Sequence, residues 1–223
     1  MKLGLIADVH ANSLALAAVL ADMPPVETIV CAGDIVGYNP VPSKCLKRVR
    51  SVASIVVQGN HDRTVDSPQK YLGNPAARAG LEHAQAQLSD QQQSWLQTRP
   101  RTATVADDEY LLVHSHPDPD RRGDYVFPDD AADLQPFFDE YSGIIYGHTH
   151  IQYERTVDGQ RVINPGSVGQ PRDSDRRAAY AVLDTERDTV DLCRTQYDID
   201  RVYHEIAISD LPTASGERLY NGE

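Results

Sequence analysis

Short apolar runs alternate with helix-like segments over the first sixty residues of the chain. Three of these runs are typical of buried strands, and they are Leu3–Ile6, Thr28–Cys31 and Ser54–Val57. Between them the pattern predicts two helices, one capped by Ser13 and the other over Ser43–Val49. This order of strand, helix and strand predicts three parallel strands whose carboxyl ends meet at one edge of a sheet.

The pattern changes after residue 64. No strand pattern is present up to residue 100, and helices are predicted around Ala76–Leu88 and Asp90–Gln97, where they would cover one flank. Further along, apolar runs come in pairs joined by turns, as in hairpins. The predicted strands of this half are Thr102–Val105, Tyr110–Val113, Gly143–Tyr146, Gln152–Val157, Arg161–Ile163, Ala179–Leu183 and Val190–Arg194. The polar tail from Thr213 to residue 223 is expected to fray.

Length and composition limit the class of protein. A chain of 223 residues fits one hydrophobic core, so we expect a single domain over residues 1–223. The longest apolar stretch, Leu14 to Ala21, is far shorter than the roughly 20 residues of a membrane helix. Cys31, Cys45 and Cys193 form no C-x-x-C pair and are expected to be reduced thiols. We therefore expect a soluble, cytoplasmic protein with no membrane partner.

The charge balance is strongly acidic, with a formal net charge of −12. Such a charge repels nucleic-acid polymers, so a general nucleic-acid-binding protein is disfavoured. The acids are mostly aspartate (24 of 33), and only 4 of the 21 basic residues are lysine. We take this surface as a sign of a halophilic protein, because high salt screens the repulsion between like charges. The alternative is compositional drift in a GC-rich genome.

Three oxygen-bearing side chains follow the three predicted parallel strands at equal spacing. Asp8, Asp34 and Asn60 are each 26 residues apart, which is about one strand–helix–strand period. Ligand sites in folds of this kind form where the carboxyl ends of parallel strands meet. We therefore expect the three side chains to converge.

Five of the eight histidines lie near these positions or at the ends of later predicted strands, and they are His10, His61, His114, His148 and His150. Taken singly, an aspartate after a strand is most often a turn or cap residue, and a lone histidine is most often a packing residue. Taken together, imidazole and carboxylate groups match first-row divalent cations. The set therefore favours a metal site.

The same residues fall into ordered motifs, which are Asp8-Val9-His10, Gly33-Asp34-Ile35-Val36-Gly37, Gly59-Asn60-His61-Asp62, His114 and Gly147-His148-Thr149-His150. This set strongly resembles the calcineurin-like metallophosphoesterase family, over residues 1 to about 183. A further motif, Asn164-Pro165-Gly166-Ser167-Val168-Gly169, resembles a signature of the small single-domain bacterial and archaeal phosphodiesterases of that family.

The resemblance implies the fold and the metal ligands. The implied fold is α/β (α+β), a four-layer α-β-β-α sandwich in which helices flank two mixed sheets. One metal would be held by Asp8, His10, Asp34 and His150, with Asp34 bridging to the second. The second metal would be completed by Asn60, His114 and His148. Two divalent ions are expected, with manganese first and iron, zinc, nickel or cobalt as alternatives, because these ligands suit all of them.

The resemblance also implies a mechanism. A hydroxide that bridges the two metals would attack phosphorus in line, so no protein nucleophile is needed. His61 would stabilise or protonate the leaving oxygen, and Asp62 would orient His61. An aspartate beside a histidine fixes its tautomer and favours its protonated form, which agrees with those roles.

Some positions depart from the family pattern or have two readings. The family usually has glycine after the histidine of the fourth motif, where this chain has Ser115, and we expect the next residue, His116, to be exposed. Asn12 either contacts phosphate or caps the helix that begins at Ser13. Arg172 is either a phosphate clamp or an exposed arginine.

We expect a dimetal phosphoesterase that acts on a small phosphodiester, phosphomonoester or dinucleoside polyphosphate. A nucleic-acid polymer is disfavoured as a substrate by length and charge, and the sequence allows an oligomer. The alternative is a non-catalytic metal-binding or scaffold protein on the same fold, since fold alone does not fix activity. His61 favours the enzyme, because only catalysis needs an acid-type histidine beside the metal ligands.

Overall fold

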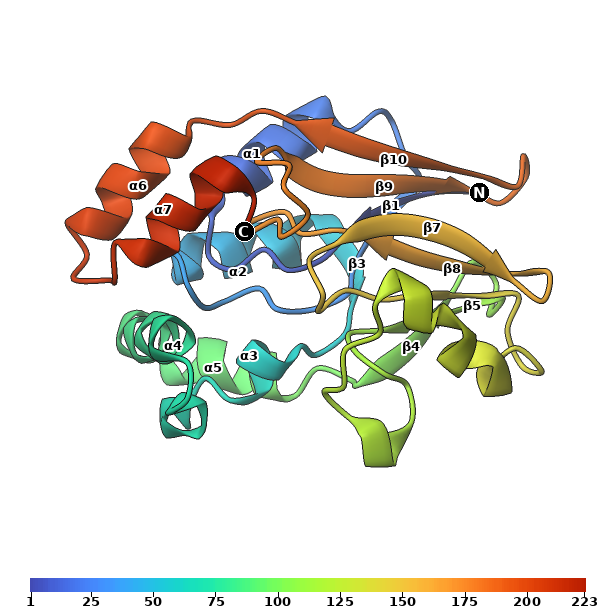
Figure 1. The fold of residues 1–223 in the computed structure, drawn as a ribbon, viewed down its shortest axis with the longest axis horizontal. Coiled ribbons are helices and arrows are strands. Elements are labelled where there is room, and N and C mark those ends of the chain that lie inside the picture. The colour runs from blue at the N-terminus through green and yellow to red at the C-terminus, as the bar shows by residue number, and fades with distance from the viewer.

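Two five-stranded sheets, each with parallel and antiparallel pairs, lie face to face in the computed structural model, which describes all 223 residues (Figure 1). The first sheet has the strand order β10-β9-β1-β2-β3 and the second the order β4-β5-β6-β8-β7. The strands are β1 (Lys2–Ile6), β2 (Thr28–Cys31), β3 (Ala53–Val56), β4 (Thr102–Val105), β5 (Tyr110–Val113), β6 (Gly143–Ile145), β7 (Gln152–Val157), β8 (Gln160–Pro165), β9 (Ala178–Asp184) and β10 (Thr189–Thr195).

The predicted parallel strands are confirmed, because β2 pairs in parallel with both β1 and β3. The C-terminal hairpin β9–β10 extends this sheet in the antiparallel direction, with β9 next to β1. The predicted hairpin of β4 and β5 is also present, and β6 pairs in parallel with β5 and β8. All of these parallel strands end at the same side of the molecule.

Side chains alternate between the two faces of each sheet. Leu3 and Leu5 of β1 point into the core between the sheets, whereas Ile6 packs under the helices. In β9, Leu183 faces the other sheet and Val182 faces the helices. The two sheets therefore share one buried core, and the outer face of the first sheet has a second core of its own.

Four α-helices contribute to that second core: α1 (Ser13–Asp22), α2 (Pro42–Val52), α4 (Pro75–Gln87) and α5 (Asp90–Gln97). Two short helices, α3 (Asn60–Arg63) and the 3₁₀ helix η1 (Pro68–Tyr71), precede α4. Ser13 was predicted to cap the first helix, but the cap is Asn12, whose side-chain oxygen accepts a hydrogen bond from the Ala15 N–H at 3.0 Å, and Ser13 is the first helical residue. Asn12 directly precedes the helix, and a side chain at that position can reach an N–H of the first turn.

The outer face of the second sheet is covered by a 3₁₀ segment, η3 (Pro128–Phe137), which follows a shorter one, η2 (Pro119–Arg121). Leu134 of η3 packs with Tyr146 and Val162 of the sheet. The sequence pattern did not predict this layer, because 3₁₀ turns lack the 3.6-residue period and Pro136 interrupts the segment. The expected fold of two mixed sheets flanked by helices is confirmed, with this segment as its fourth layer.

The C-terminal tail was expected to fray, and here the prediction is wrong. It forms α7 (Ala214–Asn221), which packs on α6 (Ile199–Ala207). Leu219 of α7 is buried with Val202 and Ile206 of α6, and Leu14 of α1 borders the same cluster. A short helix with one apolar turn is stabilised by tertiary contacts, which its local sequence does not show.

None of the helices combines the length and apolar character needed to cross a membrane.

Candidate metal centre and active site

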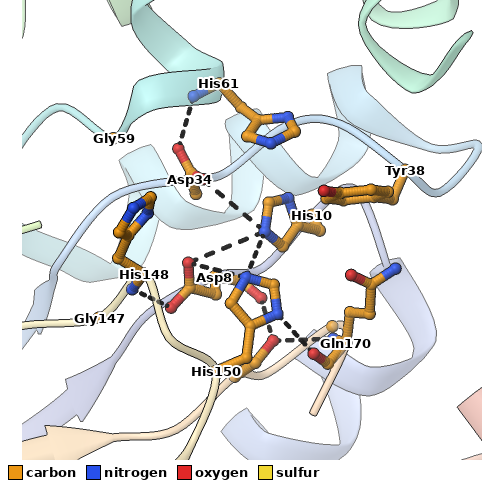
Figure 2. Close-up of polar contacts among 12 residues, drawn as sticks. Asp8, His10, Asp34, Tyr38, Gly59, His61, Gly147, His148, His150 and Gln170 are labelled. Atoms are coloured by element: carbon orange, nitrogen blue, oxygen red, sulfur yellow. Dashed lines mark hydrogen bonds and ion pairs between the residues drawn. The ribbon is translucent and has the colours of Figure 1, made fainter. Parts of the chain in front are cut away.

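The carboxyl ends of strands from both sheets meet at one edge, and the polar side chains of the motifs gather there (Figure 2). Asp8 and Asp34 follow β1 and β2, and Asn60 opens α3 just after β3. His114 follows β5, and the loop after β6 carries His148 and His150. The expected convergence of these side chains is therefore what the structure shows.

The loops that carry Asp34 and Asn60 touch each other through glycine. A Cβ atom on Gly33 would lie 2.5 Å from the Gly59 nitrogen, and one on Gly59 would lie 2.0 Å from Asp34 Oδ1. Gly33 also has a φ of +92°, which favours glycine. The glycines before Asp34 and Asn60 thus let the two loops approach closely.

One group of possible ligand atoms comes from Asp8, His10 and His150. His150 Nε2 lies 3.4 Å from Asp8 Oδ1, and His10 Nε2 lies 3.8 Å from the same oxygen. The two Nε2 atoms are 3.0 Å apart. All three side chains are buried.

A second group comes from Asp34, His114 and His148. His114 Nε2 lies 3.4 Å from Asp34 Oδ2 and 3.0 Å from the side-chain oxygen of Asn60. Asp34 Oδ2 also lies 3.8 Å from His10 Nε2 in the first group. Asp34 therefore stands between the two groups.

Backbone carbonyls fix the orientation of these imidazoles. His10 Nδ1 lies 3.0 Å from the Val36 oxygen, and His150 Nδ1 lies 2.6 Å from the Gln170 oxygen. Since a carbonyl oxygen only accepts, each Nδ1 donates its hydrogen, which leaves a lone pair on Nε2. His114 Nδ1 likewise donates to the Ala32 oxygen at 2.7 Å, but its Nε2 faces the oxygens of Asn60 and Asp34, at 3.0 and 3.4 Å, so this ring carries a hydrogen on both nitrogens.

His148 has the opposite arrangement. Its Nε2 donates to the Gly123 oxygen at 2.9 Å, so its lone pair is on Nδ1.

The first group consists of acceptors that face one another. The lone pairs of His10 and His150 meet at 3.0 Å, and Asp8 Oδ1 is buried without any hydrogen-bond partner. Buried acceptors without a donor destabilise the fold, and a cation bound among them would satisfy all of them together. Nitrogen and carboxylate oxygen ligands suit first-row divalent cations, so the residues fit the metal that the sequence predicted.

The pKa values of the cluster reflect burial and mutual charge. Burial raises the pKa of Asp8 to about 7 and holds the pKa of His10 and of His150 well below the usual range. Burial also opposes the ionised form of Asp34, but His114 and His61 outweigh it and hold the pKa of Asp34 well below its usual range. The same attraction overcomes burial at His114 and raises its pKa to about 9.

Backbone strain is concentrated at this edge. Positive φ angles, which are uncommon outside glycine, occur at Asp8 (52°), His10 (43°), Asp34 (53°), His148 (70°) and His150 (61°). Conformations of this kind cost energy and persist where the surrounding structure imposes them, often at functional sites. The sequence analysis did not predict these positive φ angles.

His61 lies at the same edge, beside both groups. Its backbone N–H donates to Asp34 Oδ1 at 2.8 Å, and its ring lies 4.9 Å from the His10 ring. The ring also contacts those of Tyr38 and Tyr71, at 4.9 and 5.0 Å between centroids. Burial lowers the pKa of His61 to about 4.

Asp62 was expected to orient His61, and the structure shows no direct contact of that kind. His61 Nδ1 has no partner, while Asp62 accepts hydrogen bonds from backbone N–H groups only. These belong to Ile35 at 2.9 Å, Val36 at 3.4 Å and Gly59 at 3.2 Å. Asp62 therefore ties the loop of Asp34 to the loop that carries His61, which orients His61 only indirectly.

Arg172 lies within the site and not on the open surface. One of its terminal nitrogens donates to Gln170 Oε1 at 2.8 Å and to the Tyr38 hydroxyl at 3.3 Å. Two buried donors beside it, Arg172 Nε and Gln170 Nε2, have no acceptor. Donors without acceptors next to the cluster suit an oxyanion.

Tyr71 and Gln170 were not singled out by the sequence. The Tyr71 hydroxyl accepts a hydrogen bond from the Asn60 side chain at 2.6 Å, which fixes the amide so that its oxygen faces His114. Tyr71 lies in a segment without a motif, so only tertiary structure places it here. For Gln170, the only signal in the sequence was its position directly after the last motif.

The structure uses Asn12 for the fold. Its oxygen caps α1 and its nitrogen donates to the Gly169 oxygen at 3.1 Å, so both polar atoms of the side chain bond within the protein. The reading of Asn12 as a helix cap is therefore the one that the contacts support.

His116 was expected to be exposed, but it is buried at 2% exposure. Its Nδ1 accepts from the Asp118 N–H at 3.2 Å, and its ring packs edge-on against Phe137. The Ser115 hydroxyl accepts from the Gly123 N–H at 3.0 Å, and Gly123 in turn accepts from His148. The departure at Ser115 therefore anchors the loop behind His148.

Comparison with known proteins gives a consistent set of relatives. A family model described as "Calcineurin-like phosphoesterase superfamily domain" matches residues 1–188. An uncharacterized protein of Methanocaldococcus jannaschii is 31% identical over 99% of this chain and 98% of its own length.

Two solved structures match over the whole chain. A metallophosphoesterase from Sphaerobacter thermophilus is 32% identical, with a TM-score of 0.85 and 100% coverage of both chains. A hypothetical protein from Pyrococcus horikoshii has the same TM-score of 0.85 at 20% identity, covering 100% of this chain and 98% of that one. The second likeness concerns the fold alone.

Proposed function

Because this chain belongs to the calcineurin-like phosphoesterase superfamily and is a metallophosphoesterase, we propose that it hydrolyses a small phosphorylated compound with the help of two divalent cations. The substrate would be a phosphodiester, a phosphomonoester or a dinucleoside polyphosphate. The observation that carries the proposal is the buried set of acceptors that face one another without a donor, around Asp8, His10 and His150. A purely structural cluster would pair these acceptors with donors.

The two ligand groups suggest how the cations are held. We assign Asp8, His10 and His150 to the first cation and His114, His148 and Asn60 to the second, with Asp34 shared between them. Two cations in such a site neutralise phosphoryl oxygens and lower the pKa of water. Manganese is the metal we expect to support activity, with iron, cobalt, nickel and zinc as alternatives of similar ligand preference.

The protein's own groups complete the site. Carbonyl oxygens of Val36, Gln170 and Ala32 hold three imidazoles in fixed orientations, so the proposed ligand atoms are oriented before any substrate binds. Arg172 and Gln170 offer donors to the phosphoryl oxygens of the substrate.

We assign His61 the proton transfer to the leaving oxygen. Its ring borders the cluster, and its buried Nδ1 has no hydrogen-bond partner within the protein. Burial favours its neutral form, so the negative charge of the bound substrate would have to raise its pKa for it to act as an acid.

The test is an assay of the purified full-length protein with bis(p-nitrophenyl) phosphate and p-nitrophenyl phosphate, after chelation and reloading with each metal. We expect turnover with manganese, about two ions per chain by metal analysis, and loss of both in Asp34→Asn. Absence of turnover with every metal and both esters would contradict the proposal and favour a non-catalytic role.

A cytoplasmic location is part of the proposal. Cys31, Cys45 and Cys193 are all free thiols in the fold, which fits a reducing compartment.

A further inference from the structure

Three arginines from separate parts of the chain line one small pocket beside the proposed ligands of the second cation. Arg63 lies at the end of α3, Arg101 just before β4, and Arg122 in the loop after η2. The same pocket is lined by Asn60 and His114. The guanidinium groups therefore border the metal centre on the side of His114, whereas Arg172 contacts Tyr38 beside His10.

Only part of the hydrogen-bonding capacity of the three guanidinium groups is used. Arg122 donates to the Gln58 side-chain oxygen at 3.1 Å, and Arg101 donates from one nitrogen to backbone carbonyls, the shortest being that of Asp118 at 2.6 Å. The Arg63 side chain has no hydrogen bond within the protein, and its backbone N–H alone is bonded, to Gly59. Since a guanidinium has five N–H donors, most of them are free.

The three groups are not neutralised by the protein. Eight other arginines lie within ion-pair distance of a carboxylate, but none of these three does, in a chain with 33 acidic residues. Burial lowers the pKa of Arg101 and of Arg122, and the positive charge of Arg63 lowers both further. The cluster thus stores repulsion that a bound anion would relieve.

The loop that carries Arg122 is fixed to the metal centre. Ser115 accepts from the Gly123 N–H, and the Gly123 carbonyl holds His148, so Arg122 is anchored directly beside a proposed ligand. The side chain of Gln58, which holds Arg122, is itself fixed by donating to the backbone oxygen of Gln97 at 2.7 Å. Arg122 is itself exposed, but hydrogen bonds fix both the loop that carries it and the Gln58 side chain that it contacts.

We propose that Arg63, Arg101 and Arg122 form a subsite for a second phosphate of the substrate, joined to the phosphate that is hydrolysed. The inference rests on the proposed function and narrows its substrate class to compounds with two or more linked phosphates. Three guanidinium groups match the charge and the oxygen geometry of a phosphate. Asn60 and His114, which we propose as ligands of the second cation, line the same pocket, so the two phosphates would be neighbours. Compounds with a single phosphorus would leave the subsite empty.

Binding can be measured separately from turnover. Calorimetric titration of the manganese-loaded full-length protein with imidodiphosphate, a two-phosphorus compound, is compared with titration by inorganic phosphate. We expect Arg63→Gln and Arg122→Gln each to weaken imidodiphosphate binding about tenfold or more, and phosphate binding by less than about threefold. Arg63→Lys, which keeps the charge, should recover part of the loss.

Kinetics give the second measurement. For Arg63→Gln and Arg122→Gln we expect kcat/KM to fall about tenfold or more for diadenosine tetraphosphate and to stay within about twofold for bis(p-nitrophenyl) phosphate. Arg121→Gln is the matched control, because Arg121 lies next to Arg122 but pairs with Asp124 and Asp133. This control variant should leave kcat/KM unchanged for both substrates.

The outcomes separate the two proposals. Unchanged imidodiphosphate binding in the variants, or equal losses for one-phosphorus and two-phosphorus compounds, would overturn the subsite. Arginine-dependent binding of imidodiphosphate in a protein that hydrolyses nothing would support the subsite and contradict the proposed hydrolysis.

Discussion

At the scale of single residues, His61 and Asp62 are neighbours with different tasks. His61 has a buried ring nitrogen without a hydrogen-bond partner, whereas both carboxylate oxygens of Asp62 accept hydrogen bonds from backbone N–H groups. A change at His61 is therefore expected to affect the reaction, and a change at Asp62 the stability of the site. This difference can be tested by substitution.

Replacing His61 with alanine should lower kcat for bis(p-nitrophenyl) phosphate by roughly 10²–10⁴, because a positioned acid contributes that much. His61 also forms a third group of possible ligand atoms with His10 and Asp34, so metal content must be measured in parallel. We expect the variant to retain two ions. The exposed His204→Ala variant is the control, and a kcat within threefold of the parent would remove His61 from the mechanism.

Replacing Asp62 with alanine should lower the free energy of unfolding by about 3 kcal/mol, because buried N–H groups of Ile35 and Gly59 lose their acceptor. Asp62→Asn keeps one acceptor oxygen and should lose less. Chemical denaturation measures both, with the exposed Asp66→Ala as control. Equal stability of Asp62→Ala and the parent would show that the hydrogen bonds are not needed.

At the scale of elements, the site depends on how closely α4 approaches the loop after β2. A Cβ on Gly80 of α4 would lie 2.0 Å from the Tyr38 nitrogen, which is closer than any side chain tolerates. Tyr38 in turn contacts the rings of His10 and His61. The helix therefore supports the aromatic side of the site through a contact that only glycine permits.

Gly80→Ala should destabilise the protein by about 1–3 kcal/mol, although alanine is the better helix former, because α4 must move away from Tyr38. We also expect kcat/KM to fall as Tyr38 shifts. Gly73→Ala is the matched control, since a Cβ there meets nothing within 4 Å. A more stable Gly80→Ala protein would mean that the contact is looser than the structure indicates.

At the scale of the whole molecule, the proposed metal centre joins segments that are far apart in the sequence. Its proposed ligands follow β1, β2 and β3 in the first sheet and β5 and β6 in the second. A cation held among them therefore links both sheets. Removal of the cation should therefore lower the stability of the entire fold.

Chelation with EDTA should lower the melting temperature relative to the manganese-loaded protein, because a ligand that binds only the folded state stabilises it, by about 3 kcal/mol at a hundredfold excess over Kd. Differential scanning calorimetry checks this. The Asp34→Asn variant should respond much less to manganese. A melting temperature that is the same with and without metal would argue against tight binding.

The acidic surface predicts a response to salt. With a net charge of −12, self-repulsion opposes the compact state at low ionic strength, and molar KCl screens it. If the surface is adapted to high salt, the melting temperature should rise steadily up to molar KCl. A flat or falling curve would favour compositional drift as the origin of the aspartate excess.

The sequence by itself determined the parallel strands, the hairpins and the identity of the residues at the strand ends. It could do so because the apolar period reports which residues are buried, and because Asp8, Asp34 and Asn60 repeat at one strand–helix–strand spacing. The sequence did not predict the covering segment η3 or the C-terminal helix α7, since both are stabilised by contacts with distant residues.

Tertiary structure alone decided how the site is built. The lone pairs of His10 and His150 point at each other because distant carbonyls hold the opposite ring nitrogens. Arg63, Arg101 and Arg122 lie in one pocket because α3, β4 and the loop after η2 meet beside His114. A local pattern records which groups are present, but the directions of those groups follow from contacts between segments that are far apart in the chain.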